Sequence, residues 1–504
     1  MKRFLWLTVL LMLGTACTAK YDVVVIGGGT GGTAAAIEAA RNGVSVLIIE
    51  QSPWLGGMLT SAGVSAVDGN YRLRGGIFAE FSDSLAARYG GYEALKSGWV
   101  SNILFNPAAG ADILLRMAQE AGVQLRLQTD FHSVRHSGND WIIVLDDGSK
   151  VRARILVDGT ELGDVASALD IPALPSDGPV QDLTYVLTVK KYDHDVLIPR
   201  PEDYDVNRYR NCCLNPLAEN REGLNPDGQH LWPPEQMLSY GMLPDGEMMI
   251  NWPISGNDYY LDYLNLSKEE REKALQGARN RSLGFLYFMQ QELGYTRLGI
   301  ADDVYPSDDG LPFYPYYREA RRIAGRDTMT FAAAAHPYDY DLYTRAVAVG
   351  DYPVDHHHLQ YPKWKEMHVQ PYDRIPSFSV PLGVVMPVSV EDFLVADKAI
   401  SVDYDINGST RLQPVILGIG QAAGALAALA VRGGCHPSEV PVRDVQETLL
   451  DHGCYLLPFL DLKPGDEGFR QLQLDGLDGK VRGEGRSVGW VNETWVHSPI
   501  VETP

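Results

Sequence analysis

A glycine-rich turn near the start of the chain has the residue types and spacing to bind a diphosphate. Gly27, Gly29 and Gly32 follow the apolar run 23–26 and precede the Ala-rich run 33–42. In a strand–turn–helix unit of this G-x-G-x-x-G type, the first glycine permits a tight turn and the second lets the backbone approach a pyrophosphate. The third allows close contact between helix and strand. The helix N-terminus adds N–H groups and partial positive charge.

An acidic residue completes this unit. Glu50 closes the second apolar run, 44–49, where it could accept hydrogen bonds from ribose hydroxyls. Strand, turn, helix and acid together predict a dinucleotide-binding βαβ unit rather than a merely structural glycine turn. The residues expected to contact the dinucleotide here are Gly27, Gly29, Thr30, Gly31, Gly32 and Glu50.

A pair of arginines further along the chain could act on a substrate. Arg318 and Arg321 could clamp a carboxylate or polarise a carbonyl group. The alternative interpretation is that they form salt bridges with Glu319 or Asp327.

The run Asp355-His356-His357-His358 is the other candidate cluster. In an extended segment, His356 and His358 would share one face, and Asp355 and His357 the other. A histidine here could be an acid/base catalyst, and solvated loop histidines are the alternative. We predict no metal site, because no further ligand lies at a suitable spacing.

Alternating strands and helices would position these residues, which predicts an α/β fold. An amphipathic helix is expected from about residue 110, then a strand at 123–127 and a hairpin of 129–134 with 141–145. A buried strand at 154–158 leads into the Gly/Asp-containing turn 158–164.

These features give the chain a definite resemblance over residues 21 to about 458. It resembles a bacterial FAD-dependent oxidoreductase family with a glutathione-reductase-type fold, distantly similar to fumarate reductase flavoprotein subunits and sometimes labelled xanthan-lyase-like. The segments that carry the resemblance are Tyr21–Gly32, Gly56–Ser61, Phe105–Pro107, Tyr317–Gly325, Tyr352–Asp355, Ile375–Pro376 and Arg411–Gly424. The turn 158–164 departs from the more compact family pattern, Ala-Thr-Gly-Asp-Gly-Asp.

The resemblance implies FAD as the cofactor, in a doubly wound parallel sheet with an inserted β-rich substrate cap. It implies that His357 points toward flavin and substrate. N–H groups at a helix N-terminus near residues 420–422 are expected to face the flavin pyrimidine, and a plain core helix is the alternative. The further cofactor contacts that it implies are Gly56, Gly57, Met58, Val134, Asp164, Gly420, Gln421 and Ala422.

The domain organisation follows from the same order of elements. We expect a signal segment at 1–17, the first part of the FAD-binding domain at 21–165, and the cap at 166–344. The second part of the FAD-binding domain is expected at 345–434, followed by a C-terminal helix and loop-rich tail at 435–504. A capping-box pattern at 267–270 predicts that the cap's main helix begins there and runs to about residue 293.

Composition and the N-terminal residues indicate the partners of the protein and its location in the cell. The 504 residues carry a net charge of −22, which argues against nucleic acid as a partner. A basic start, an apolar run 4–13 and small residues before Cys17 predict an exported, lipid-anchored protein of the periplasm or cell envelope. The alternatives are ordinary cleavage near Ala16 or Ala19, and a non-functional extension.

Four further cysteines follow Cys17. Cys435 and Cys454 could form a disulfide outside the cytoplasm, although sequence cannot fix the pairing. Cys212 and Cys213 are adjacent, either as a redox-active pair or, more simply, as two buried thiols.

Together these features predict an exported FAD-dependent oxidoreductase. It would transfer a hydride between a small organic substrate and flavin N5, with an unidentified electron acceptor because no second βαβ fingerprint is present. The alternatives are a carbohydrate-acting lyase, or a flavin-bearing electron carrier or binding protein.

Overall fold

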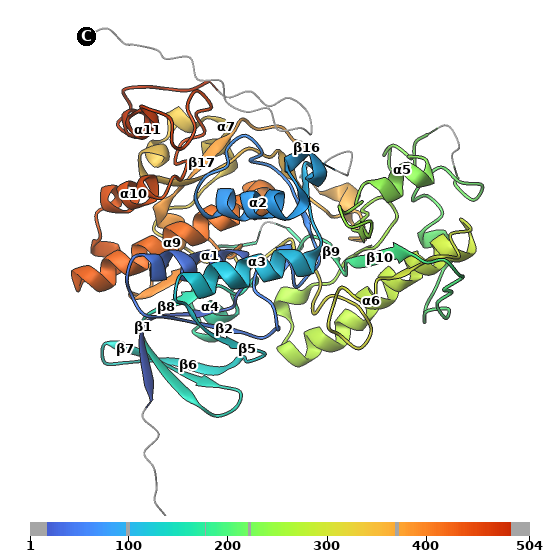
Figure 1. Cartoon of the computed structure of the whole chain (residues 1–504), viewed down its shortest axis with the longest axis horizontal. Coiled ribbons are helices and arrows are strands. Elements are labelled where there is room, and N and C mark those ends of the chain that lie inside the picture. Colours follow the sequence, from blue (N-terminus) through green and yellow to red (C-terminus); the bar gives the residue numbers. More distant parts are fainter. Residues whose placement is uncertain (1–17, 97–100, 177, 220–222, 368–371, 485–504) are drawn as a thin grey trace, which may run out of the picture.

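A computed structural model describes residues 18–96, 101–176, 178–219, 223–367 and 372–484. Cys17 lies outside this part of the chain. The chain forms two lobes: a large one built on a central sheet, and a smaller one that carries α5 (Pro234–Ser239), α6 (Lys268–Gln291) and β10 (Leu187–Lys191) (Figure 1).

The central sheet has seven strands and confirms the α/β prediction. Its order is β5-β2-β1-β8-β7-β6, with β18 also paired to β8. The strands β5, β2, β1, β8 and β18 run parallel to one another. Strand β7 pairs in antiparallel orientation with β8 on one side and with β6 on the other. Their bounds are β1 Ala19–Ile26, β2 Val46–Glu50, β5 Gln124–Leu127, β6 Phe131–Ser137, β7 Asp140–Leu145, β8 Lys150–Asp158 and β18 Phe393–Val395.

The buried centre of this sheet explains the apolar run at 23–26. Val24 pairs with Leu47 of β2 on one side and with Leu156 of β8 on the other. Strands that are covered on both faces are apolar throughout rather than alternating. The register aligns the C-terminal ends of β1, β2 and β8 at one edge, where the glycine turn follows β1.

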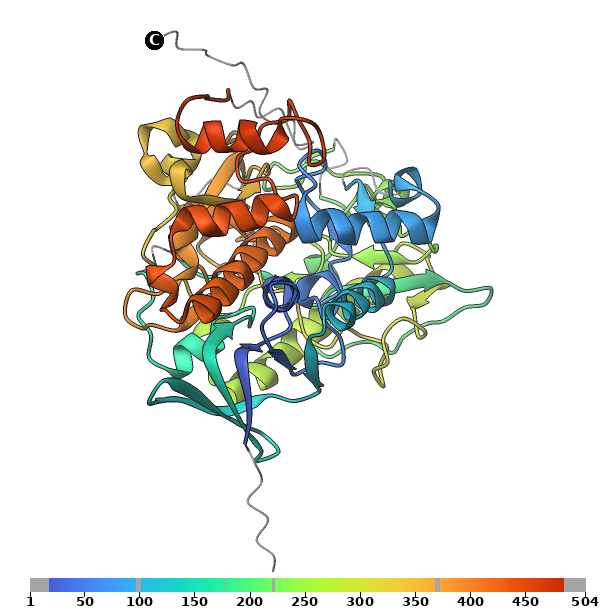
Figure 2. The same cartoon turned by 60° about the vertical axis from the view of Figure 1, so that its left-hand side comes forward.

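Helices cover the sheet, and α1 and α9 lie against each other (Figure 2). By length and composition, α9 is the one helix in the described chain that could span a bilayer, but 83% of its most apolar window is buried inside the protein. It is therefore a core helix. The helices of this lobe are α1 Thr30–Arg41, α2 Gly76–Tyr89, α3 Pro107–Glu120, α4 Asp164–Ala168, α7 Phe331–Ala335, α8 Tyr404–Thr410, α9 Gln413–Gly433, α10 Val442–Asp451 and α11 Phe469–Leu477.

Short strand pairs complete the large lobe. They are β3 Ala66–Val67 with β4 Ile103–Leu104, β14 Ala346–Gly350 with β17 Phe378–Pro381, and β15 Val354–Asp355 with β16 Tyr372–Asp373.

The smaller lobe, called the cap below, has its own hydrophobic core. Aromatic and aliphatic side chains of α6 pack there against the short antiparallel strands. The predicted capping box is confirmed, since Ser267 and Glu270 exchange hydrogen bonds at the start of α6. The remaining cap strands are β9 Leu183–Thr184, β11 Met248–Ile250, β12 Asp258–Tyr259 and β13 Leu298–Ile300.

The C-terminal region differs in part from the prediction. Helix α10 is where a helix was expected, but the stretch predicted to be loop-rich contains α11. Phe469, Gln473 and Leu477 recur at every fourth residue and bury one face of this short helix.

All four described cysteines are free thiols, so the structure does not contain the anticipated Cys435–Cys454 disulfide. The Sγ atoms of Cys212 and Cys213 lie 3.5 Å apart in the core of the cap.

Candidate functional site

A cleft of about 910 Å³ opens at the C-terminal edge of the parallel strands. Gly27, Gly29 and Glu50 line one wall, Gly159 and Thr160 after β8 continue it, and α6 of the cap forms the opposite wall. Ligand pockets are typically ~300–1,000 Å³. The crevice beyond the carboxyl ends of parallel strands is the usual ligand position in such sheets.

The glycines of the turn are required by close backbone packing. A Cβ atom on Gly31 would lie 1.5 Å from the carbonyl oxygen of Ala396, and one on Gly29 would lie 2.7 Å from that of Gly159. On Gly32 it would lie 2.1 Å from the oxygen of Gly27. The turn therefore packs against the residues that follow β8 and β18, and its remaining side faces the cleft.

Glu50 closes the turn from the side of β2. Its Oε2 accepts the Gly28 N–H at 2.7 Å, and its Oε1 accepts the Ser52 N–H at 2.8 Å. Burial raises the pKa of Glu50 to about 7, although these hydrogen bonds oppose the shift. The carboxylate keeps lone pairs available for a ligand hydroxyl.

The segment after β2 lies directly behind the turn. Thr30 Oγ1 donates to the Gly56 carbonyl at 2.7 Å, and a Cβ on Gly57 would lie 2.8 Å from Gly29 Cα. Of the predicted cofactor residues, Gly27, Gly29, Glu50 and Asp164 line the cleft. Those that pack around the turn without lining it are Thr30, Gly31, Gly32, Gly56, Gly57 and Met58.

Two predictions of cofactor contacts need correction. Val134 pairs with Ile143 within the β6–β7 hairpin and does not line the cleft; Gln128, Asp130 and Phe131 do. The predicted contact was placed too far along the hairpin because a strand pattern does not show where the strand leaves the cleft.

The second correction concerns residues 420–422. They lie in the middle of α9, which begins at Gln413, so their N–H groups belong to the helix ladder and not to its N-terminus. Gln421 bridges Glu38 of α1 and the Ile77 N–H, and a Cβ on Gly420 would lie 2.1 Å from the Gly31 oxygen. This glycine-rich stretch therefore serves helix packing.

Ion pairs join the cap to the large lobe across the cleft. Asp164 pairs with Arg271 of α6 at 3.0 Å and with Arg321 at 2.8 Å, and Lys268 contacts Asp130. Arg321 thus lines the cleft wall. It pairs with Asp164 rather than with the expected Glu319 or Asp327.

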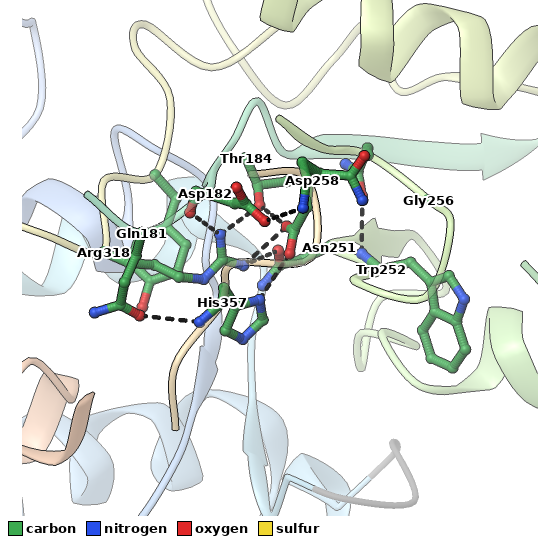
Figure 3. Close-up of polar contacts among 12 residues, drawn as sticks. Gln181, Asp182, Thr184, Asn251, Trp252, Gly256, Asp258, Arg318 and His357 are labelled. Atoms are coloured by element: carbon green, nitrogen blue, oxygen red, sulfur yellow. Dashed lines mark hydrogen bonds and ion pairs between the residues drawn. The ribbon is translucent and has the colours of Figure 1, made fainter. Parts of the chain in front are cut away.

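The second predicted catalytic residue, His357, points toward the carboxylate of Asp258 (Figure 3), and a second carboxylate, that of Asp355, lies on the other side of its ring. Its Nδ1 is 2.7 Å from Asp258 Oδ2 on β12, and its Nε2 is 3.4 Å from Asp355 Oδ2 on β15. Burial and the nearby Arg318 lower the pKa of His357, but Asp355 and Asp258 outweigh them, so it is raised overall. The ring therefore keeps its proton to a higher pH than an ordinary histidine does.

Arg318 pairs with Asp258 and joins it to the neighbouring polar groups of this cluster. It is 1% exposed, and its Nη2 lies 3.1 Å from Asp258 Oδ1 and 3.2 Å from Asn251 Oδ1. Its Nη1 donates to the Asp182 carbonyl and to Thr184 Oγ1 at 2.8 and 2.9 Å. Although burial alone would raise the pKa of Asp258, Arg318 and His357 lower it to about 2.

A second arginine supports the other carboxylate. Arg411 Nη2 lies 3.1 Å from Asp355 Oδ2, and Nη1 donates to Tyr316. Burial alone would raise the pKa of Asp355, but His357 and Arg411 lower it below its ordinary value. Asp68 lies close enough to this group for electrostatic coupling, and burial raises its pKa to about 6.

The neighbouring histidines face the other way, as the extended geometry predicted. His356 and His358 stack on each other with ring centroids 5.4 Å apart. Burial lowers the pKa of His356 to about 4 and that of His358 to about 3. Both are neutral core residues, so only the central histidine of the run belongs to the site.

Sequence reasoning missed most partners of His357. Asp258 is separated from it by about a hundred residues, and Arg411, which pairs with Asp355, by about fifty. No local spacing marked Asp258 or Asp68. The structure also shows a buried Lys398 beside the glycine turn, paired with Glu161 at 2.8 Å. Within the described chain, no group of three or more His, Cys, Asp or Glu side chains is arranged to hold a metal ion.

The residues present fit a dinucleotide with a diphosphate at the glycine turn. The turn has no room for side chains, the cleft is of suitable size, and Glu50 stands where a ribose would lie. Glu161 lines the same cleft, and its Oε2 is held by Lys398.

Comparison with known proteins agrees with this geometry. A family profile described as "FAD dependent oxidoreductase" matches residues 22–449, which is most of the chain.

Curated relatives match over short stretches. NADH:fumarate oxidoreductase of Klebsiella pneumoniae (strain 342) is 42% identical over 89 residues, 17% of this chain and 9% of that protein. Vinyl phenol reductase of Lactiplantibacillus plantarum is 50% identical over 50 residues, 10% of each chain. The matched stretch is thus about a tenth of the length of these relatives.

Solved structures are similar over about a third of the chain. Glycine oxidase from Geobacillus kaustophilus has 15% identity and a TM-score of 0.24, covering 34% of this chain and 64% of that one. The flavin-dependent monooxygenase PieE, solved with FAD and substrate, has 17% identity and a TM-score of 0.26, covering 34% and 35%.

Proposed function

Because the chain belongs to the family of FAD-dependent oxidoreductases, we propose that it transfers a hydride between flavin N5 and a small organic substrate beside His357. FAD, when bound, supplies the two-electron chemistry, while the protein orients the substrate and handles the proton. The observation that carries the proposal is the position of His357 between Asp258 and Asp355.

His357 holds the proton for this reaction. The two carboxylates stabilise its imidazolium form, and the Nδ1–H bond to Asp258 fixes the ring. When the substrate is reduced, His357 gives up this proton to it; when the substrate is oxidised, the neutral ring takes a proton from it. His357 retains 12% side-chain exposure, whereas Arg318 is almost fully buried. A substrate would therefore meet the histidine and not the arginine.

Arg318 is a positioning residue in this proposal. Its two terminal nitrogens already contact four groups, so it has little capacity left to clamp a substrate carboxylate. The charges of Arg318, Arg411 and His357 face the carboxylates of Asp258, Asp355 and Asp68, and also Asp182, whose pKa burial raises to about 7. Because no positive charge is left uncompensated, the cluster favours an uncharged substrate that carries a hydroxyl, a carbonyl or an activated double bond.

The experiment is an anaerobic survey of flavin colour with the full chain. Neutral sugars and alcohols are added to the oxidised holoprotein, and neutral unsaturated carbonyl compounds to the dithionite-reduced form. We expect one class to change the visible flavin absorbance. The variant His357→Gln should slow this change by ~10²-fold or more while FAD content and reduction by dithionite stay the same.

His436→Gln is the matched control, because His436 also pairs with an aspartate, Asp392 at 3.0 Å, but is 48% exposed and remote. It should leave the rate unchanged. Equal rates for His357→Gln and the unaltered protein would contradict the role of His357. Product formed without any change in flavin absorbance would contradict the oxidoreductase reaction and favour a lyase.

The location of the protein in the cell is a separate part of the proposal. We infer from residues 1–17 that the chain is exported to the periplasm or cell envelope and lipid-anchored through Cys17, so that it meets its electron acceptor outside the cytoplasm. Labelling of cells with a palmitate analogue should mark the protein and fail to mark Cys17→Ser. Label retained by the variant would contradict the anchor.

A further inference from the structure

Two adjacent cysteines in the core of the cap have no part in the reaction proposed above. Cys212 and Cys213 are both buried, and the thiol of Cys212 donates to the sulfur of Cys213 at 3.5 Å. A free cysteine in a core usually packs as a small apolar side chain. Here the two sulfur atoms face each other instead, and a movement of ~1.5 Å would bring them to the S–S bond length of about 2.05 Å.

The contacts of the two thiols differ. Cys213 Sγ accepts from the Cys212 thiol and also from Asn215 Nδ2 at 3.7 Å. The hydrogen bond from Cys212 lowers the pKa of Cys213, whereas burial raises the pKa of Cys212. Because the thiolate is the attacking form in thiol–disulfide exchange, Cys213 is the nucleophile of the pair. The chain leaves the core directly after it, since Pro216 and Leu217 are exposed.

A disulfide between neighbours in sequence is easily broken. The Cα atoms of adjacent residues lie about 3.8 Å apart across a trans peptide, whereas ordinary disulfides join Cα atoms about 4.4–6.8 Å apart. A bond between Cys212 and Cys213 is therefore distorted, and distorted disulfides are the ones that are reduced readily and serve regulation. Such a bond would be reversible rather than a permanent cross-link of the fold.

The peptide group between the two cysteines also holds a tryptophan. The carbonyl oxygen of Cys212 accepts the indole N–H of Trp252 at 2.9 Å, and Trp252 is 4% exposed in the core of the cap. This peptide group must turn when the two sulfur atoms approach each other. Its carbonyl then leaves the indole N–H, and a buried donor without an acceptor is unfavourable. Formation of the disulfide should therefore displace Trp252.

Trp252 lies in the same loop as two partners of Arg318. Asn251, the residue before it, accepts from Arg318 Nη2 at 3.2 Å, and Asp258 pairs with the same arginine. The backbone N–H of Trp252 is bonded at 2.8 Å to Asn257, the residue before Asp258. In Figure 3 the indole ring of Trp252 points away from the polar cluster, whereas Asn251 and Asp258 point into it. A displacement of Trp252 should thus reach the residues that position the site.

We propose that Cys212 and Cys213 form a reversible disulfide in the exported protein, and that this bond slows the reaction at His357 by displacing Trp252. The oxidant is a disulfide compound of the kind that maintains oxidising conditions outside the cytoplasm. The Cys213 thiolate attacks one sulfur of this oxidant and releases the other as a thiol. The sulfur of Cys212 then attacks Cys213, loses its proton and releases the second thiol. The oxidant thus gains the two electrons and two protons that the cysteines lose.

The first experiment detects the bond itself. The full chain is treated with diamide, a small azo compound that takes up two electrons and two protons, and the remaining free thiols are then alkylated. Trypsin releases the peptide 211–221, which contains Cys212 and Cys213 and no other cysteine. We expect this peptide to be lighter by two hydrogen atoms and not alkylated, and dithiothreitol to reverse the change. Alkylation of both cysteines after diamide treatment, or cross-linking of either to another chain, would overturn the proposal.

The second experiment measures the effect on the site. The rate at which substrate changes the flavin absorbance should fall about fivefold or more in the oxidised protein and recover with dithiothreitol. Cys212→Ala and Cys213→Ala should each give the same rate with and without diamide; the serine variants replace them if they fold poorly. Cys435→Ser removes a free thiol of the large lobe and should respond as the unaltered chain does. An unchanged rate in protein whose disulfide has been mapped would overturn the control of the site.

A third experiment tests the route through the indole. Trp252→Phe keeps an aromatic ring but removes the N–H, so the disulfide should still form while the ratio of reduced to oxidised rates falls toward one. Trp232→Phe changes another tryptophan of the cap and should keep the full ratio. A full ratio in Trp252→Phe would overturn this route. The effect on the rate rests on the proposed function, whereas the mapped disulfide does not, so the failure of one is distinguished from the failure of the other.

Discussion

The glycine turn and the His357 cluster are two polar sites built in different ways. In the turn, backbone packs on backbone: Gly29 lies against Gly159, and Gly31 against Ala396. In the cluster, side chains pack on side chains, with Arg318 and His357 sharing the carboxylate of Asp258. The first site depends on the absence of side chains, and the second on the charges that side chains bring.

This contrast explains why the two sites tolerate different changes. The turn should fail when any atom is added, even an apolar one. The cluster should keep its shape when a side chain is replaced by one of similar volume, but lose its electrostatic balance. Four substitutions test this difference, from the largest expected effect to the smallest.

Adding one methyl group to the turn should have the largest effect. Gly31→Ala would place a carbon atom 1.5 Å from a backbone oxygen, so we expect a loss of more than about 3 kcal/mol of stability, and no bound flavin. Thermal unfolding and flavin content of the purified chain measure this. Gly433→Ala is the control, because its Cβ would only approach Cys435 Sγ at 3.2 Å, and it should retain both properties. Normal flavin content in Gly31→Ala would show that the turn tolerates an added side chain, and would contradict the contrast between the turn and the His357 cluster.

Removal of the buried cation from the cluster should come next. Arg318→Met leaves Asp258 without its strongest partner, and breaking a buried pair costs about 3–5 kcal/mol. Denaturant unfolding should show this loss, and a smaller one for Arg321→Met, whose partner Asp164 is 30% exposed. Equal losses would mean that Arg318 has no special place in the cluster.

A change of charge without change of shape should alter the pH dependence. Asp258 raises the pKa of His357, so Asp258→Asn lowers it. In the direction that reduces the substrate, the rate falls as pH rises through this pKa, because the proton is lost. The variant should therefore lose activity at a lower pH than the unaltered protein, and its kcat near neutral pH should fall about tenfold or more. The pH profile of kcat/KM measures the shift, and an unmoved alkaline limb would contradict the proton-donor role.

The smallest effect concerns the far end of the cleft. Phe131→Ala removes a lining side chain and should weaken FAD binding several-fold, within the range expected for partial loss of apolar contact. Val134→Ala changes the outer part of the same strand and should leave the affinity unchanged. Calorimetric titration of both variants decides between them, and the reverse order would restore Val134 as a cofactor contact.

The sequence was sufficient for the fold and for the turn because their signals are local. The apolar run at 23–26, the glycines and Glu50 all lie within residues 23–50, and each position has a steric or hydrogen-bonding reason. The capping box of α6 and the alternating faces of residues 355–358 were predictable for the same reason: they follow from backbone geometry over a few residues.

The cluster could not be predicted in this way. Asp258 and Arg318 meet His357 only through the packing of the cap on the large lobe, whereas Arg411 lies in the large lobe and pairs with Asp355. No short spacing in the sequence identifies these partners. The misplaced residues 420–422 show the reverse error. In the sequence, the glycines of this stretch indicate the start of a helix, whereas α9 begins at Gln413 and Gly420 packs against Gly31 in its interior.

The backing of the glycine turn by Ala396 and Asp397 also bears on the order in which the molecule is made. A ribosome completes residues 27–32 early, but the strand β18 and the two residues that brace the turn emerge more than three hundred and sixty residues later. A nascent chain that stops short of them has the motif without its support. The coenzyme can therefore be bound only after about four fifths of the 504 residues have been translated, and chains released before that point should be colourless.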